Sequence, residues 1–107
     1  NNLTTVTGEP AGVEFATPSV TSPGLEAVFP GENPDAFAAA VTQLIPDLQY
    51  TNLQHRGYMV VHFSKSECRA QWRFVDTVKQ KEFRVLENYF KEMVTRVGEG
   101  KLVSADV

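Results

Sequence analysis

The side chains that most often carry out chemistry in proteins are few and widely spaced in this chain of 107 residues. The histidines are His55 and His62, and the single cysteine is Cys68. A metal ion or an activated nucleophile needs several such groups at one point. The sequence has no carboxylates grouped with a histidine at a metal-ligand spacing, no glycine-rich phosphate loop, and no serine-hydrolase or zinc motif. The sequence therefore predicts no catalytic residue and no metal ligand within this chain.

Two further groups of residues are candidates for binding. Arg56, Arg69 and Arg73 suit an anion, although a solvated strand face explains them equally well. The stretch 17–24 contains two prolines, a glycine and several hydroxyl side chains. Such a loop either satisfies its own backbone or lines a polar site at the end of a strand, and in the second case Thr21 and Ser22 lie beside that site.

Two predicted strands, residues 58–63 and 68–75, must position these groups. The first is apolar at nearly every position, and the second alternates apolar and polar residues, which is typical of a half-buried strand. The connection over residues 64–67 has the length of a hairpin loop. With Phe63 opposite Cys68, a one-residue slip would bury polar side chains. One face then carries Met59, Val61, Phe63, Cys68, Ala70, Trp72 and Phe74, and the other carries Tyr58, Val60, His62, Arg69, Gln71 and Arg73.

This register decides which reactive groups can meet. His62 lies opposite Arg69, and a neighbouring cation disfavours metal binding there. Cys68 lies on the apolar face near Trp72, where we expect a small core residue. His62 and Cys68 therefore do not form a metal-binding or nucleophilic pair. We expect both histidines to be surface or structural residues.

A helix is predicted over residues 34–45. Asn33 is suited to cap its N-terminus, Pro34 to occupy its first position, and Asp35 to lie in its first turn. Apolar residues then recur at helical spacing; these are Phe37, Val41, Leu44 and Ile45. We expect this stripe to pack on the apolar face of the hairpin, which gives an α+β fold: a hairpin-based sheet against an amphipathic helix.

The remaining segments have weaker patterns. We expect a lead-in loop over residues 1–12, a short strand over 13–16, a helical turn over 25–29, and a turn or cap at Asp76. In the tail, residues 79–107, the stretch 82–97 fits helical spacing and strand composition equally well. A turn is predicted at 98–100.

Composition limits the class of protein. The length predicts a single unit over residues 1–107. The net charge of −3 and the pI of about 5.3 give no support to a nucleic-acid surface. No apolar run has the length of a membrane span, which is roughly 20 residues. One cysteine excludes an internal disulfide framework.

Three stretches together resemble the C-terminal part of the PhoD-like alkaline phosphatase/phosphodiesterase family (alkaline phosphatase D). They are Val-Glu-Phe-Ala-Thr-Pro-Ser-Val-Thr-Ser-Pro-Gly-Leu at 13–25, Asn-Leu-Gln-His-Arg-Gly-Tyr at 52–58 and Trp-Arg-Phe-Val-Asp-Thr-Val at 72–78. Their order and spacing match the family, with an amphipathic helix between the first two. The resemblance covers residues 13–78 and fades after Lys79. Family members tend to finish with an extended segment, which favours a strand in the tail.

The resemblance implies a hydrolase of phosphomonoesters and phosphodiesters with an α/β/β/α metallophosphatase sandwich and a metal set such as iron and calcium. It also implies export to the periplasm or the outside of the cell. One departure matters. The family's metal-binding Asp, Asn and His motifs, including the final Gly-Asp-x-His, lie upstream of the stretch that resembles residues 13–25. No metal ligand or other cofactor contact is therefore carried over to this chain.

Two hypotheses remain. In the first, the chain is a structural C-terminal part of such a phosphatase, inactive alone, and meets the phosphate-ester substrate only through the full-length protein. In the second, it is a non-catalytic α+β module for binding or for self-association through an exposed sheet edge.

Overall fold

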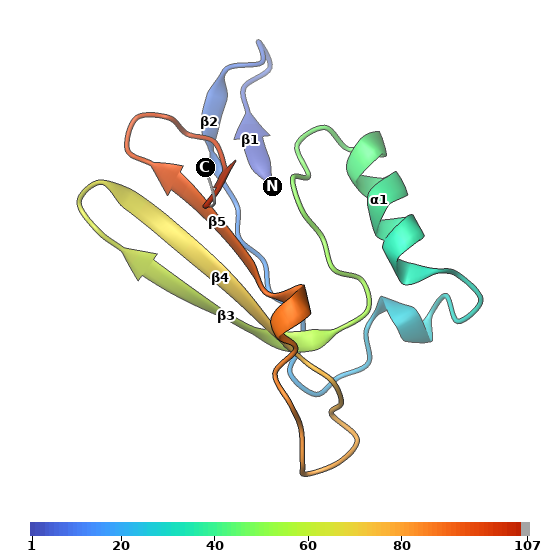
Figure 1. Cartoon of the computed structure of the whole chain (residues 1–107). Coiled ribbons are helices and arrows are strands. Elements are labelled where there is room, and N and C mark those ends of the chain that lie inside the picture. Colours follow the sequence, from blue (N-terminus) through green and yellow to red (C-terminus); the bar gives the residue numbers. More distant parts are fainter. Residues whose placement is uncertain (106–107) are drawn as a thin grey trace.

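The computed structural model describes residues 1–105, which form an α+β fold with two antiparallel sheets and one α-helix (Figure 1). The smaller sheet pairs β1 with β2, and the larger has the strand order β3-β4-β5-β6. In chain order the elements are β1 (Asn2–Thr4), β2 (Pro10–Val13), the 3₁₀ turn η1 (Leu25–Ala27), α1 (Pro34–Leu44), β3 (Arg56–Phe63), β4 (Glu67–Val75), the 3₁₀ turn η2 (Glu87–Tyr89), β5 (Lys91–Arg96) and β6 (Val103–Ser104).

The central hairpin has the predicted register. Phe63 pairs with Cys68, Met59 with Trp72, and His62 with Arg69. His62 and Cys68 therefore lie on opposite faces, as predicted, because successive side chains of a strand alternate between faces. The tip of the hairpin is residues 64–66, where the Ser64 hydroxyl accepts hydrogen bonds from the backbone N–H groups of Ser66 and Glu67.

The apolar face of the larger sheet forms the core. Its buried side chains come from β4, β5 and the segment before β6: Ala70, Trp72, Phe74, Met93 and Leu102. Val13, Phe15, Tyr50 and Tyr89 pack against them. The rings of Phe15 and Tyr50 each lie 5.8 Å from the Trp72 ring. The Trp72 Nε1–H donates to the Ala16 carbonyl over 2.8 Å, so the chain after β2 is fixed across the sheet.

Helix α1 forms where the sequence predicts it. The Asn33 side chain accepts hydrogen bonds from the backbone N–H groups of Asp35 and Ala36, at 3.0 and 3.1 Å, and Pro34 occupies the first turn. The helix ends at Leu44, and Ile45 is its C-cap. Within the described part of the chain, no helix has the length and apolar character needed to cross a membrane.

The packing predicted for α1 is wrong. None of its 11 residues is buried, and the Leu44 side chain is 80% exposed. The segment 46–55 runs between α1 and the sheet, and Tyr50 from this segment covers the apolar sheet face instead (Figure 1). Helix α1 contacts the segment that follows η1 through the rings of Phe37 and Phe29, whose centroids are 5.4 Å apart.

The N-terminus also differs from the prediction. Residues 1–12 are not a simple lead-in loop, because β1 and β2 form a small antiparallel hairpin there. The predicted strand over 13–16 has only its first residue, Val13, in β2. The predicted turn over 25–29 is present as η1, and the loop 17–24 is irregular as expected.

The part of the tail that was ambiguous, residues 82–97, contains a strand. Residues 91–96 form β5, which pairs with β4, so the helical alternative for 82–97 is excluded. A turn follows over residues 97–99, and β6 then pairs with β5. Of the turn or cap predicted at Asp76, the structure shows a cap: its carboxylate accepts from the Arg84 backbone N–H over 2.9 Å, and its own backbone N–H donates to the Arg84 carbonyl over 3.0 Å.

Candidate functional site

An open hollow of about 760 Å³ lies where β3 begins and β4 ends, and we call it the strand-end hollow. Three separate segments line it: the hydroxyl-rich loop after β2, the residues that lead into β3, and the residues that follow β4. Its lining residues are Thr21, Ser22, Pro23, Ala27, Gln54, His55, Arg56, Val75, Asp76, Thr77, Val78 and Lys79.

The hairpin register brings two of these segments together. Arg56 at the start of β3 pairs with Val75 at the end of β4, so the residues before Arg56 and after Val75 leave the sheet side by side. The predicted site-adjacent residues, Thr21 and Ser22, form part of the third wall. Thr21 and Ser22 were expected beside a site only if their loop lines one, and the structure places both at this hollow.

Two glycines permit the close approach of the three segments. A Cβ atom on Gly57 would lie 2.1 Å from the Arg73 carbonyl oxygen. A Cβ atom on Gly24 would lie 2.3 Å from the Nη1 atom of Arg56. The contact at Gly57 is with backbone, which cannot move aside, so strand β3 needs glycine there. The contact at Gly24 is with the far end of the Arg56 side chain, which can shift, so glycine eases this contact without being required for it.

Arg56 is the buried cation of the hollow. It is 7% exposed, and its Nη1 donates to the His55 carbonyl over 3.2 Å. The interpretation of the three arginines as a solvated strand face is therefore wrong for Arg56. The interpretation as a solvated strand face holds for the other two arginines, which are partly exposed. Arg69 pairs with Glu67 at 2.8 Å and with Glu92 at 2.6 Å. Arg73 lies over the Phe90 ring, 5.1 Å from its centroid.

His55 is held by side chains on two sides. Its ring lies 4.2 Å from the Tyr89 ring and 6.0 Å from the Phe74 ring. Its Nδ1 is 3.1 Å from the Asn52 amide nitrogen. Burial lowers the pKa of His55 below its ordinary value, and Asp35 offsets part of that effect. His55 is therefore a partly buried, neutral ring at pH 7, as expected for a structural histidine.

The chain's other ionisable groups do not form a second site. Cys68 is partly exposed and lies outside the core cluster, so the expectation of a small core residue is wrong. Burial raises the pKa of its thiol, which disfavours a reactive thiolate. Glu92 accepts hydrogen bonds from Gln71 and Arg69, and these contacts lower the pKa of its carboxyl despite some desolvation. These residues form a polar strand face.

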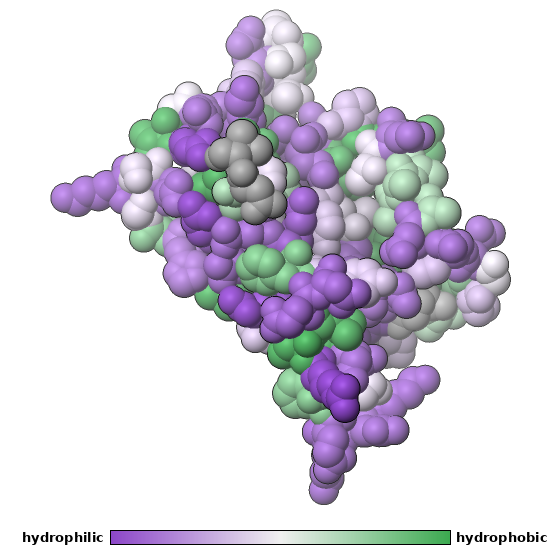
Figure 2. Space-filling view, viewed as in Figure 1, coloured by the Kyte–Doolittle hydropathy of each residue, from purple (hydrophilic) through white to green (hydrophobic). Residues whose placement is uncertain are grey.

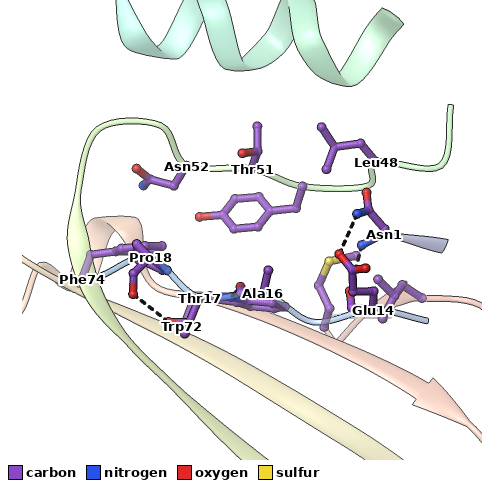
Figure 3. Close-up of a pocket in the computed structure, with 13 residues that line it drawn as sticks. Asn1, Glu14, Ala16, Thr17, Pro18, Leu48, Thr51, Asn52, Trp72 and Phe74 are labelled. Atoms are coloured by element: carbon purple, nitrogen blue, oxygen red, sulfur yellow. Dashed lines mark hydrogen bonds between the residues drawn. The ribbon is translucent and has the colours of Figure 1, made fainter. Parts of the chain in front are cut away.

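A smaller pocket of about 150 Å³ lies on the apolar side of the sheet (Figure 3). The segments 14–18 and 48–52 face one another across it, and Trp72 and Phe74 lie on the sheet side. At one end the Asn1 side chain donates to the Glu14 carboxylate over 3.1 Å. Because much of its lining also packs the core, we attribute this pocket to packing.

A metal ion does not fit the residues present. In residues 1–105 no three histidine, cysteine, aspartate or glutamate side chains lie close enough together to hold one. Asp76 is the single carboxylate among those lining residues of the hollow that the structure describes, and one of its oxygens already accepts from the Arg84 backbone. We therefore derive no chemical step through a metal ion in this chain.

The sequence did not predict that Arg56, Thr77 and Lys79 lie close to Thr21 and Ser22. The signal for Arg56 and Thr77 is in the sequence, because each lies within a stretch that resembles the family and two residues outside a predicted strand. Lys79 carries no such signal, because it follows the last of those stretches.

Comparison with known proteins supports the resemblance. The chain matches the family described as PhoD-like phosphatase over residues 1–72. This range includes the β1–β2 hairpin and ends at Trp72, within β4. No curated protein and no solved structure matches the chain. Because the family match covers more than half of the sequence, the chain belongs to the PhoD-like phosphatase family.

Proposed function

We propose that this chain is a structural C-terminal part of a metal-dependent phosphatase and phosphodiesterase domain, and that it does not hydrolyse phosphate esters alone. In this proposal the metal ligands, for a set such as iron and calcium, lie in another segment of the domain. The larger sheet of this chain then forms part of an α/β/β/α sandwich. The parent protein acts in the periplasm or outside the cell.

The observation that carries the proposal is the convergence of three segments at one end of the β3–β4 hairpin. The loop 17–24, the approach to β3 and the end of β4 each contain a stretch that resembles the family, and all three line the strand-end hollow. Functional residues often lie on loops that a rigid sheet positions. The hairpin then acts as the scaffold that holds this face toward the rest of the domain.

Exposed apolar side chains support the idea that further protein covers this chain. Val28, Leu44 and Phe63 are 64%, 80% and 82% exposed. On the face shown in Figure 2, hydrophilic residues surround separate hydrophobic areas, including one over α1. Covering these side chains with further protein would remove their apolar surface from water, which is favourable.

Hydrolysis of bis(4-nitrophenyl) phosphate tests the proposal. With iron and calcium present, we expect turnover by a longer family protein that contains this chain and none by residues 1–107 alone. Chelation should abolish the turnover of the longer protein. Metal-dependent turnover by residues 1–107, or none by the longer protein, contradicts the proposal.

The free edge of β3 favours the second candidate function, self-association. Within the described residues, β3 is the outermost strand of its sheet and pairs on one side only. An unpaired edge offers backbone donors and acceptors to another chain. Light scattering over a range of concentrations should then report dimers or larger species, and an apolar dye should bind. A monomer without dye binding counts against this candidate.

A further inference from the structure

We propose that the loop between β4 and η2, residues 77–83, is a proteolytic cleavage site at which a protease that cuts after basic residues divides the chain without unfolding it. The bonds to be cut follow Lys79 and Lys81. In each cut, water adds across one peptide bond and leaves a new carboxylate and a new amino group. The cleavage site is independent of the proposed function, because exposure, hydrogen bonds and packing determine whether a protease reaches it.

This loop is open to solvent along its length. Residues 78–84 are all exposed, and the Phe83 ring is 60% exposed. In Figure 1 the loop between β4 and η2 projects away from both sheets and from α1. In the part of the chain that the structure describes, residues 80–83 make no hydrogen bond. Exposed, weakly held loop tips are the preferred positions of proteolytic cuts.

The base of the loop is closed, so the open part has a defined length. The Asp76 backbone N–H donates to the Arg84 carbonyl over 3.0 Å, and the Arg84 N–H donates to the Asp76 carboxylate over 2.9 Å. Val75 pairs with Val85 directly beside this contact. The loop between the two closing residues is long enough to extend over roughly 23 Å. Because extended peptides bind other proteins through their backbone, such a loop can enter a protease without opening the sheet.

The tip of the β3–β4 hairpin, residues 64–66, is the matched opposite case. Lys65 is exposed there as well. However, the Ser64 backbone N–H donates to the Glu67 carbonyl over 2.9 Å, and the Ser64 hydroxyl accepts from the Glu67 N–H over 3.1 Å. A turn this short becomes extended only when the pairing of β3 with β4 opens. An exposed lysine is therefore not sufficient for cleavage.

Contacts outside the loop hold the two products together. Strand β5 pairs with β4 along its whole length. Met93 from β5 and Leu102 from the segment before β6 are buried in the core. The Leu102 backbone N–H also donates to the Asn2 side chain over 2.8 Å. None of these contacts involves the loop, so the cut chain should keep its larger sheet.

Cleavage would nevertheless change the strand-end hollow. Thr77, Val78 and Lys79 line the hollow. A cut after Lys79 turns them into a free chain end that carries a new carboxylate. The cut therefore modifies one wall of the hollow and leaves the fold in place.

Limited digestion with trypsin, followed by mass spectrometry, tests the proposal on residues 1–107. We expect cuts after Lys79 or Lys81 at least about tenfold faster than after Lys65, because the hairpin tip must open before it is cut. The two products should elute together in size-exclusion chromatography and separate in urea. Lys79→Gln with Lys81→Gln should slow the first cut at least about tenfold, since trypsin's specificity pocket requires a cation. Lys65→Gln should leave the first cut unchanged.

A first cut after Lys65, equal rates at the tip and the loop, or products that separate without urea would overturn the proposal. Circular dichroism identifies a chain that does not fold alone, and the longer family protein then decides through the same digestion. Its first cut within this chain should again follow Lys79 or Lys81, and protection of both bonds there overturns the proposal.

Discussion

The two ends of the β3–β4 hairpin carry similar residue types in different surroundings. Each end has a phenylalanine, a histidine and an arginine: Phe74, His55 and Arg56 at the strand end, and Phe63, His62 and Arg69 near the tip. Phe74 is 1% exposed, whereas Phe63 is 82% exposed. The strand end is packed by three segments distant in sequence, while the tip is covered by none of them.

This difference shows that residue type alone does not mark the end of the hairpin for which we propose a function. Arg69 meets two glutamates on the sheet surface, while Arg56 is enclosed by the loop 17–24 and faces a hollow. What separates the two ends is which other segments reach them. The family-like stretches reach the strand end, so we expect substitutions there to have the larger effects.

The largest difference is expected between the two phenylalanines. Phe74→Ala removes a fully buried ring and should lower the free energy of unfolding by about 3–5 kcal/mol. Phe63→Ala removes an exposed ring and should change it by less than about 0.5 kcal/mol. Urea unfolding followed by Trp72 fluorescence measures both. Similar losses for the two variants would show that the two ends are equally packed.

The next largest effect is expected at Gly57. Gly57→Ala places a Cβ atom against the Arg73 carbonyl, and we expect a loss of about 1–3 kcal/mol or more. Gly31→Ala is the matched control, because its Cβ would meet nothing within 4 Å. Urea unfolding of both variants makes the comparison, and a Gly57→Ala variant as stable as Gly31→Ala would argue against the close approach of β3 and β4.

The smallest effect concerns pH. Because burial lowers the pKa of His55 below 6.5, the unfolded chain binds this proton more tightly than the folded chain. The stability contributed by the neutral ring is complete above about pH 6.5 and decreases as pH falls toward the lowered pKa. Urea midpoints at pH 7.5 and 5.5 should differ less in His55→Gln than in the unmodified chain. His62→Gln retains His55, so its urea midpoints at the two pH values should differ as much as in the unmodified chain. The same difference in His55→Gln would contradict this prediction.

Local patterns predicted part of this fold. The register of β3 and β4 follows from alternation within one hairpin, and α1 follows from its own cap and first turn. The stretch 82–97 was ambiguous, because pairing with β4 decides it and no local pattern contains that pairing. The position of α1 was wrong for the same reason, since the segment 46–55 takes the place expected for the helix.

The residues of the candidate site carried weaker signals. Thr21 and Ser22 were expected beside a site only if their hydroxyl-rich loop lines one rather than satisfying its own backbone. Arg56 was one of three arginines that the sequence did not distinguish. Its burial depends on the path of the loop 17–24, which brings Gly24 against its guanidinium group. Such a contact between distant segments has no periodic signal in the sequence.

The most direct test of the account compares substitutions at the two ends of the hairpin in the longer family protein. The measurement is the rate of bis(4-nitrophenyl) phosphate hydrolysis. We predict that Thr21→Val with Ser22→Ala at the strand end lowers this rate about threefold to tenfold, whereas Lys65→Ala at the tip leaves it unchanged. Equal losses at both ends, or a loss confined to the tip, would contradict the claim that the strand end is the functional end of this chain.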